Sequence, residues 1–327
     1  MSRFDIHGYG FHPPFEGVNG RRAENVCRLD LFRTCWAMTL QSGRCFGAGE
    51  ESDLLERFDL GLRAQLMVQV DGGAYKLRPT FNSLRSEEKR KITESLEETF
   101  IKLALERRLG IPWLVRLDPL LDTPIRPAKG LVGQHKTLGR DSKGRWHLVE
   151  VGKVVGSETR PETENQGRES IIGVNGQPIA TCTEATVRLE GGPIRVDLKN
   201  SAPNGSRNIV ISEDVFFTHY YSGLKELLLT GEVREEGVFG MTYMISTLDD
   251  LPSPETYEVG LSTSLVEDPS RARSVCNDFL TEEKRGNFVT DQSRCIGPDG
   301  VMVEIEGYAS NGTKESWGDW FFEAHHI

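Results

Sequence analysis

Three ionisable residues in one short stretch of the chain have side chains that could do chemistry together: Asp141, Glu150 and Lys153. Asp141 opens the segment Asp-Ser-Lys-Gly, with the acid at the first position and the glycine at the fourth, as a type I turn favours. Glu150 and Lys153 follow in the segment 146–155, which is apolar and β-branched enough for a strand buried on both faces. Charged groups in such a strand need partners, because burying an unpaired charge is costly.

The best-defined element that could position these residues is a long helix over residues 87–109. Ser86 is its expected N-cap, acidic residues follow in the first turn, and Gly110 supplies the stop. The apolar spacing predicts that Leu96, Phe100 and Leu103 are buried against a strand at 111–117, and that Glu94 and Glu98 are exposed. Other expected elements are helices at 21–40, 51–58 and 213–230, hairpins at 65–77 and 183–199, and a β-rich segment from 238 onward.

This order of elements predicts a mixed α+β chain of the α/β type with three regions. Residues 1–84 form an N-terminal helical and hairpin region, residues 85–235 an α/β core, and residues 236–327 a β-rich C-terminal region.

Length and composition restrict the class of protein. The 327 residues include 39 Lys and Arg against 49 Asp and Glu, a formal net charge of −10. This argues against a surface that grips a phosphate backbone throughout, although a local basic groove stays open. The six cysteines contain no Cys-x-x-Cys pair, which predicts reduced thiols rather than a disulfide framework or zinc site. No secretory signal or long apolar run occurs, so we expect a cytoplasmic protein without a membrane segment.

Four motifs follow one another along the chain: Leu-Gly-Ile-Pro-Trp-Leu at 109–114, Gly-Leu-Val-Gly-Gln at 130–134, the Asp141 turn leading to a Val-Glu strand, and Gly-Pro-Asp-Gly-Val-Met-Val-Glu at 297–304. Together they resemble uncharacterised bacterial proteins with a restriction-endonuclease-like core of the PD-(D/E)xK type. The resemblance implies a core sheet flanked by helices. It also implies that Glu150 is a Mg²⁺ ligand and that Lys153 orients the attacking water for phosphodiester hydrolysis. Asp141 would be the other ligand of an active site only if its turn folded over the strand, and its place in the turn already explains it.

The sequence departs from that family pattern at two places. Lys129-Gly130 stands where the family has Pro-Asp, and no acid occurs between Asp122 and Asp141. Lys153 comes one residue late after Glu150, so in a regular strand the two side chains face opposite ways. A β-bulge at Val151-Gly152 would bring them back to one side, so we expect that bulge if the site is active.

Each candidate also has an explanation without catalysis. Glu150 and Lys153 could survive from a degenerate site as a polar pair or at a solvent-exposed strand end. The segment 197–199 also has the acid-x-lysine pattern, but its alternation favours a solvated strand face. Glu97 and Glu98 of the long helix could supply a metal carboxylate, although such residues far more often form the exposed face of a helix.

Three functional hypotheses remain. The first is a non-catalytic protein that binds a protein partner through a degenerate restriction-endonuclease-like core, without a cofactor, in a bacterial defence or mobile-element system. The second is a Mg²⁺-dependent DNA nuclease whose rearranged site uses Asp141 or a helix glutamate with Glu150 and Lys153. The third is a small-molecule or carbohydrate enzyme on an unrelated fold, which the sequence neither supports nor excludes. Fold analogy cannot decide among them.

Overall fold

A computed structural model of the chain describes residues 2–40, 54–117, 135–152, 171–201, 207–238, 240–248, 256–275, 277 and 293–306. It contains both helices and sheets, so the expected mixed α and β class is confirmed. The helices are α1 (Arg28–Thr39), α2 (Leu54–Leu66), α3 (Ser86–Leu109), α4 (Glu213–Thr230) and α5 (Thr263–Glu267), with short 3₁₀ helices η1 (Glu16–Val18), η2 (Pro79–Ser83) and η4 (Pro269–Arg271). The strands are β1 (Ser2–Tyr9), β2 (Gly20–Val26), β3 (Val68–Asp71), β4 (Ala74–Leu77), β5 (Trp113–Arg116), β6 (His135–Arg140), β7 (Trp146–Gly152), β8 (Ile171–Val174), β9 (Gln177–Pro178), β10 (Thr181–Arg188), β11 (Arg195–Ser201), β12 (Arg207–Ile209), β13 (Val233–Val238), β14 (Met241–Leu248), β15 (Thr256–Ser262), β16 (Arg294–Ile296) and β17 (Val301–Glu306).

The largest sheet has nine strands. Eight of them follow the order β3-β4-β1-β11-β10-β7-β6-β5, and the ninth, β2, pairs antiparallel with β1 outside that order. The strands β5, β6 and β7 are antiparallel neighbours, whereas β10 runs parallel to β7 and β1 runs parallel to β11. The first strand of the chain is therefore an interior strand of the same sheet that holds β7. Two smaller sheets have the orders β13-β14-β15-β17-β16 and β12-β8-β9.

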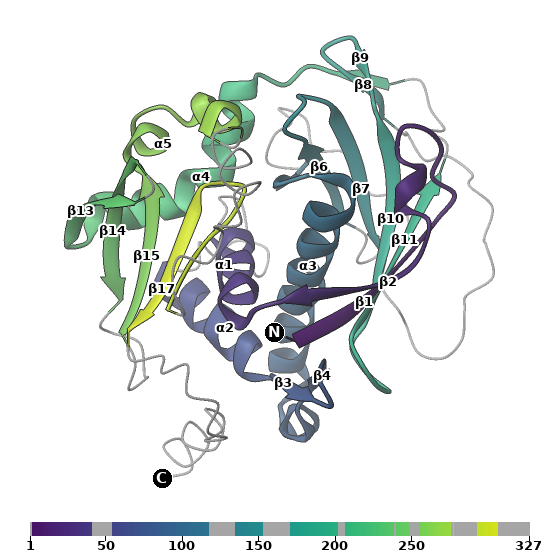
Figure 1. The fold of residues 1–327 in the computed structure, drawn as a ribbon, viewed down its shortest axis with the longest axis horizontal. Coiled ribbons are helices and arrows are strands. Elements are labelled where there is room, and N and C mark those ends of the chain that lie inside the picture. Colours follow the sequence, from purple (N-terminus) through teal and green to yellow (C-terminus); the bar gives the residue numbers. More distant parts are fainter. Residues whose placement is uncertain are drawn as a thin grey trace.

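Helices α1, α2 and α3 lie between the nine-stranded sheet and the C-terminal sheet (Figure 1). The side chains of α1 point both ways: Phe32 and Trp36 join a core cluster with the C-terminal sheet and α4, while Leu31 and Cys35 join a second cluster with α3 and the large sheet. A helix that is buried all round needs no single apolar stripe, and eleven of the residues of α1 are buried. Among the described residues, none of the helices has both the length and the apolar character that crossing a membrane requires.

A group of charged side chains, which we call the interior ionic cluster, joins α1 and α3 to the turn before β17. It consists of Asp30, Arg33, Lys102, Glu106 and Asp299. The Arg33 guanidinium donates to Asp299 Oδ1, to Asp30 Oδ1 and to Glu106 Oε2, each at 2.8 Å. Lys102 Nζ donates to Glu106 Oε1 at 2.5 Å and to Asp299 Oδ2 at 3.1 Å. Both cations have fully buried side chains, so these pairs are shielded from water.

Asp299 is the centre of this cluster and also anchors α4. Tyr220 donates its hydroxyl hydrogen to Asp299 Oδ2 at 2.6 Å, and Tyr221 donates to the backbone carbonyl of Asp299 at 2.6 Å. Burial alone would raise the pKa of Asp299, but Arg33, Lys102 and the Tyr220 hydrogen bond outweigh it and lower the pKa to about 2. The carboxylate is therefore charged at neutral pH.

Several predicted elements are confirmed at close to their expected bounds. The long helix is α3, and it ends at Gly110, which has the left-handed φ of 66° that favours glycine. Leu96, Phe100 and Leu103 are fully buried, as expected. The hairpins β3-β4 and β10-β11 form, and Ser212 caps α4 by accepting from the Asp214 N–H at 3.2 Å. The helix expected at 51–58 is α2, which extends to Leu66; residues 51–53 lie outside the described part of the chain.

The helix predicted over residues 21–40 is wrong in its first third. Residues 20–26 form β2, which pairs antiparallel with β1, and α1 begins only at Arg28 with Cys27 as its N-cap. Helical spacing is a local signal, and here the edge of a neighbouring strand decides the conformation. The N-cap of α3 is also one residue earlier than predicted, at Arg85 rather than Ser86.

The expected exposure of Glu98 on α3 is wrong as well. Glu98 is buried, and its carboxylate accepts from Arg116 of β5 at 2.5 Å; Glu97 beside it is buried too, while Glu94 is half-buried. Because α3 lies between two sheets, its polar stripe also meets protein instead of water. An ion pair across to β5 then satisfies the carboxylate.

Candidate functional site

Period-two alternation gives the nine-stranded sheet two different faces. Apolar side chains of β10, β11 and β1, such as Ala185, Val196 and Ile6, point to one face and pack in the core with α3. The other face, which we call the charged sheet face, carries ionisable side chains from β1, β2, β6, β7, β10 and β11: Arg3, Asp5, His7, Arg21, Lys136, Glu150, Glu184, Arg188, Arg195, Asp197 and Lys199.

Glu150 lies in a row of four charges that crosses this face. Strand register places Lys136 opposite Glu150, Glu150 opposite Glu184, and Glu184 opposite Lys199. Lys136 Nζ is 3.3 Å from Glu150 Oε1, and Lys199 Nζ is 3.8 Å from Glu184 Oε2. The row therefore has two neighbouring carboxylates with a lysine at each end. Lys136 is the ion-pair partner that explains a glutamate in the middle of a buried strand.

Asp141 is placed elsewhere, in a buried polar group with His147. Its carboxylate accepts from the Arg145 backbone N–H at 2.7 Å and from Arg145 Nε at 2.6 Å, and lies 3.3 Å from His147 Nε2. His147 Nδ1 is 2.8 Å from the hydroxyl oxygen of Thr181. This group has the order carboxylate, imidazole, hydroxyl, but all three side chains are buried. The ring of Phe15 packs edge-on against His147 with centroids 5.6 Å apart, so the group is closed to solvent on that side.

The protonation states in this group follow from burial and hydrogen bonding. Burial lowers the pKa of His147, and the favourable contact with Asp141 only partly offsets it, so the imidazole is neutral at neutral pH. For Asp141, burial would raise the pKa, but hydrogen bonds from His147 and Arg145 lower it to about 2. The neutral imidazole then donates from Nε2 to Asp141 and accepts from Thr181 at Nδ1.

The structure does not bring Asp141 and Glu150 together. Asp141 contacts His147, whose side chain leaves β7 on the side of Val149, whereas Glu150 points to the charged sheet face. Glu150 is also three residues further along β7 than His147, or about 10 Å at the usual rise per residue. Lys153 lies outside the described residues, so its position relative to Glu150 stays a prediction. Within the described ranges no group of three or more His, Cys, Asp or Glu side chains is placed to hold a metal ion.

The bulge expected at Val151-Gly152 for an active site is absent from the described part of β7. Pairing with β10 stays in register from His147 to Gly152, which lies opposite Thr186. A Cβ atom added to Gly152 would lie 2.7 Å from Thr186 Cγ2, so the glycine permits a close approach of these two strands.

Arginine side chains dominate the other part of the charged sheet face. Asp197 accepts from Arg188 Nε at 3.2 Å and from Arg195 Nε at 2.7 Å, and Asp5 accepts from Arg21 at 2.6 Å. The side chain of Asp197 is only 7% exposed, whereas those of Arg188 and Arg21 are 60% and 68% exposed. The expectation of a solvated face at 197–199 thus holds for Lys199, while Asp197 lies beneath the arginines.

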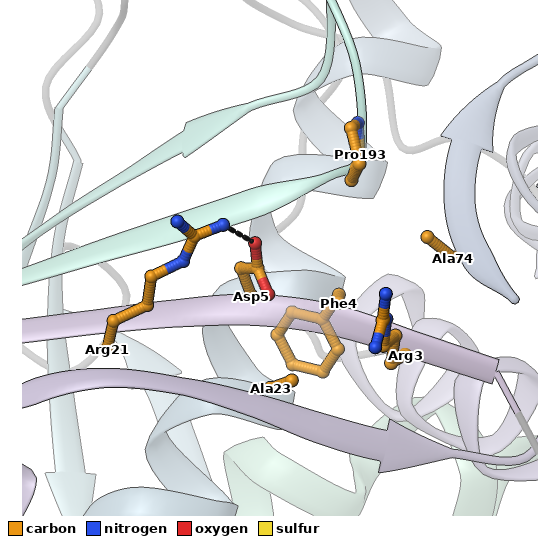
Figure 2. A pocket seen from close by; sticks show the side chains of 7 residues that line it. All are labelled: Arg3, Phe4, Asp5, Arg21, Ala23, Ala74 and Pro193. Carbon is orange, nitrogen blue, oxygen red and sulfur yellow. Dashed lines mark hydrogen bonds and ion pairs between the residues drawn. The ribbon is translucent and has the colours of Figure 1, made fainter. Parts of the chain in front are cut away.

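A hollow of about 260 Å³ lies at the start of β1, and Arg3, Asp5 and Arg21 are among the residues that line it (Figure 2). Figure 2 shows the hydrogen bond from Arg21 to Asp5. Arg3 lies closer to the start of β1 and makes no hydrogen bond to the residues drawn. Arg3 is exposed, and its guanidinium has no ion-pair partner among the described residues. We call Arg3, Arg21, Arg188 and Arg195 the arginine patch. The exposed groups of the patch are guanidinium donors, and the carboxylates of Asp5 and Asp197 that pair with them are less exposed.

The sequence interpretation missed Lys136, Arg3 and Arg21 as members of this face. The signal for β1 was present, because Arg3, Asp5 and His7 alternate with Phe4 and Ile6, and this period of two is typical of a half-buried strand. Lys136 could not be identified in this way, because its pairing with Glu150 depends on the register between two strands.

No family model, no curated protein and no solved structure matches this chain.

Proposed function

We propose that this chain is a non-catalytic, partner-binding protein on a degenerate restriction-endonuclease-like core, acting in the cytoplasm within a bacterial defence or mobile-element system. The order α3-β5-β6-β7, with β10 parallel to β7, is compatible with such a core. The lack of convergence between Asp141 and Glu150 supports the non-catalytic assignment. The observation that carries the proposal is the arginine patch, an exposed group of cations on a chain with a net charge of −10.

The chemistry of the patch favours a protein partner that presents carboxylates. A guanidinium offers several donors in a planar fork, which matches a carboxylate in a bidentate pair. Asp197 occupies part of the forks of Arg188 and Arg195, so further acceptors must approach from the solvent side. Arg3 has its whole fork available beside the hollow. An acidic segment that lies across β1 on this face would place one carboxylate at Arg3 and another on the solvent side of Arg188 and Arg195.

Fluorescence anisotropy with a labelled Glu-rich peptide tests this proposal. We expect salt-sensitive binding and about a tenfold weaker dissociation constant in the double variant Arg3→Gln/Arg188→Gln, which corresponds to about 1.4 kcal/mol. The matched control is Arg90→Gln, which removes an exposed arginine of α3 that pairs with Glu94. Equal losses in the two variants would contradict a role for the patch. Tighter binding of a duplex oligonucleotide than of the peptide would move the proposal to a nucleic-acid partner.

A Mg²⁺-dependent DNA nuclease is the alternative, and one observation favours it. Mg²⁺ is held by one or two carboxylates together with waters and substrate phosphates. Glu150 and Glu184 supply two neighbouring carboxylates, and Lys136 lies beside them. The two glutamates, rather than Asp141, would hold the ion, which would supply charge to stabilise the developing oxyanion.

Plasmid cleavage with Mg²⁺ or Mn²⁺ distinguishes the two functions. The non-catalytic protein should leave the plasmid intact with either ion. Cleavage that EDTA abolishes, and that Glu150→Gln and Glu184→Gln each reduce strongly, would establish the nuclease instead. Glu235→Gln on β13 is the control, because it removes an exposed glutamate from a different sheet.

A further inference from the structure

Two cysteines from distant parts of the sequence meet where α1 contacts the C-terminal sheet. Cys27 is the N-cap of α1, and Cys295 lies on β16, a strand that packs against α1. The two thiols are close enough for a side-chain interaction that lowers the pKa of Cys27 and raises the pKa of Cys295. Cys295 belongs to the core cluster, and Cys27 packs against that cluster. The four described cysteines are free thiols, as the sequence predicted.

The two sulfurs have different environments. Cys27 is half-buried, and its Sγ accepts from the backbone N–H of Asp30 at 3.4 Å in the first turn of the helix. The interaction with Cys295 is the main reason that the pKa of Cys27 falls to about 7; burial and Asp30 oppose this, and the Asp30 N–H and Arg107 assist it. Cys295 is buried, and the interaction with Cys27 together with burial raises its pKa. Cys27 is thus the nucleophile of the pair, with a thiol partner beside it.

We propose that Cys27 and Cys295 form a reversible, peroxide-responsive disulfide site, a redox function independent of the partner-binding function proposed above. A half-buried sulfur at a helix N-terminus, in contact with a second thiol, has the features of a sensing cysteine beside its resolving cysteine. The second thiol matters because it converts an oxidised sulfur into a disulfide that reductants can reverse.

The chemistry balances with hydrogen peroxide as the oxidant. The Cys27 thiolate attacks one peroxide oxygen, the O–O bond breaks, and the departing hydroxide takes up a proton to give water and a sulfenic acid at Cys27. The sulfur of Cys295, as it loses its proton, then attacks the Cys27 sulfur. An S–S bond forms as the S–O bond breaks, and the leaving hydroxide takes that proton as a second water. Two thiols lose two electrons, and one peroxide becomes two waters.

The disulfide would form a covalent link between α1 and the C-terminal sheet. Cys295 also lies close enough to Arg33 to interact with it electrostatically, so the link would adjoin the interior ionic cluster. A cross-link between such distant residues removes many conformations from the unfolded chain. Oxidation should therefore raise the unfolding temperature of the protein.

Peptide mapping of the full chain without reductant tests the proposal. After hydrogen peroxide we expect a peptide pair joined through Cys27 and Cys295, which dithiothreitol separates. Cys35→Ser, which changes a buried thiol of the same helix, should give the same pair. Cys295→Ala should instead leave a sulfenic acid at Cys27 that dimedone traps. An unmodified Cys27, or a disulfide from Cys27 to Cys45 or Cys276, would overturn the assignment.

Alkylation by iodoacetamide over a pH series gives a second measurement. The rate at Cys27 should have its midpoint near pH 7 in the wild-type protein and move upward, towards the ordinary thiol value of about 8.5, in Cys295→Ala, because the interaction with the second thiol is lost. An unchanged midpoint would refute the contact. Cys27→Ser keeps an N-cap oxygen, so this variant should fold, and after peroxide its unfolding temperature should not rise.

Discussion

Charged side chains gather in two regions of this protein, and burial gives the two gatherings different roles. In the interior ionic cluster an aspartate, Asp299, lies at the centre, and Arg33, Lys102 and Tyr220 surround it out of contact with water. On the charged sheet face the order is reversed, because Asp197 lies beneath Arg188 and the arginine side chain is mostly exposed. The first arrangement satisfies every partner internally, whereas the second leaves donors directed to solvent.

This difference shows why the number of ion pairs does not give their contribution to the stability of the fold. A buried pair has lost its hydration, so removing one member leaves the other charged and unpaired in the interior. When one member of an exposed pair is removed, water replaces it as the partner, so the loss in free energy is small, and salt weakens such a pair further. The interior ionic cluster therefore joins α1, α3 and α4 to the C-terminal sheet, and the arginine patch is available to bind a partner.

The largest expected effect comes from removing the central acid of the interior ionic cluster. Asp299→Ala should reduce the free energy of unfolding by about 3–5 kcal/mol, because it leaves Arg33 and Lys102 buried without their shared carboxylate. Urea denaturation monitored by tryptophan fluorescence measures this loss. Asp71→Ala, which removes an exposed partner of Lys76, should leave the urea midpoint unchanged. Similar midpoints for the two variants would break the comparison between buried and exposed pairs.

A smaller effect is expected at the buried Asp141 group. Asp141→Asn should destabilise the protein by about 1.5–3 kcal/mol at pH 7, the range for hydrogen bonds to a charged group. The folded pKa of Asp141, about 2, lies below its ordinary value, so the unfolded chain binds more protons in acid. Its stabilisation is present above about pH 4 and is lost as the pH falls towards 2.

Unfolding free energies measured from pH 5 to pH 2 should therefore fall less steeply in Asp141→Asn than in the wild-type protein. His147 contributes in the same direction over a higher range. Its folded pKa is also lowered, so its stabilisation is lost as the pH falls below about 6.5. Parallel slopes for the variant and the wild type below pH 5 would show that Asp141 is not held as a charged acceptor.

The smallest effect on stability is expected on the charged sheet face. Arg188→Gln should change the free energy of unfolding by less than about 0.5 kcal/mol, since its ion pair with Asp197 involves a mostly exposed side chain. Urea denaturation at low and at high salt measures it. A loss above about 1 kcal/mol would mean that the arginine patch is structural, which would remove the main support for partner binding.

Much of the fold could be predicted because its signals are local. The stop at Gly110 requires a positive φ, which glycine adopts readily, and the Asp-Gly-Gly turn of the β3-β4 hairpin needs the same freedom at Gly72 and Gly73. The buried stripe of α3 through Phe100 follows from helical periodicity. The turn at Asp141 also formed as expected, with the Gly144 N–H donating to the Asp141 carbonyl at 2.9 Å.

The candidate site could be predicted only in part. Glu150 is half-buried, as its place in an apolar strand indicated, whereas the burial of Asp141 did not follow from its place in a turn. Whether they act together depends on which face of β7 each one reaches, and the turn carries Asp141 to the face opposite Glu150. The ion-pair partner of Glu150, Lys136, comes from strand register rather than from a motif.

By itself the sequence determined the elements whose hydrogen bonds and apolar stripes lie within a few residues of one another: α3, α4, the two hairpins and the buried strand β7. Only the tertiary structure decided that residues 20–26 form a strand, that Glu98 is buried, and that Cys27 meets Cys295. The physical reason is that these outcomes depend on partners far away in the chain. Residues 20–26 need the edge of β1, Glu98 needs the guanidinium of Arg116 on β5, and Cys27 needs the thiol of Cys295 on β16. These partners come within reach only in the folded chain, where the helices lie between the two sheets (Figure 1).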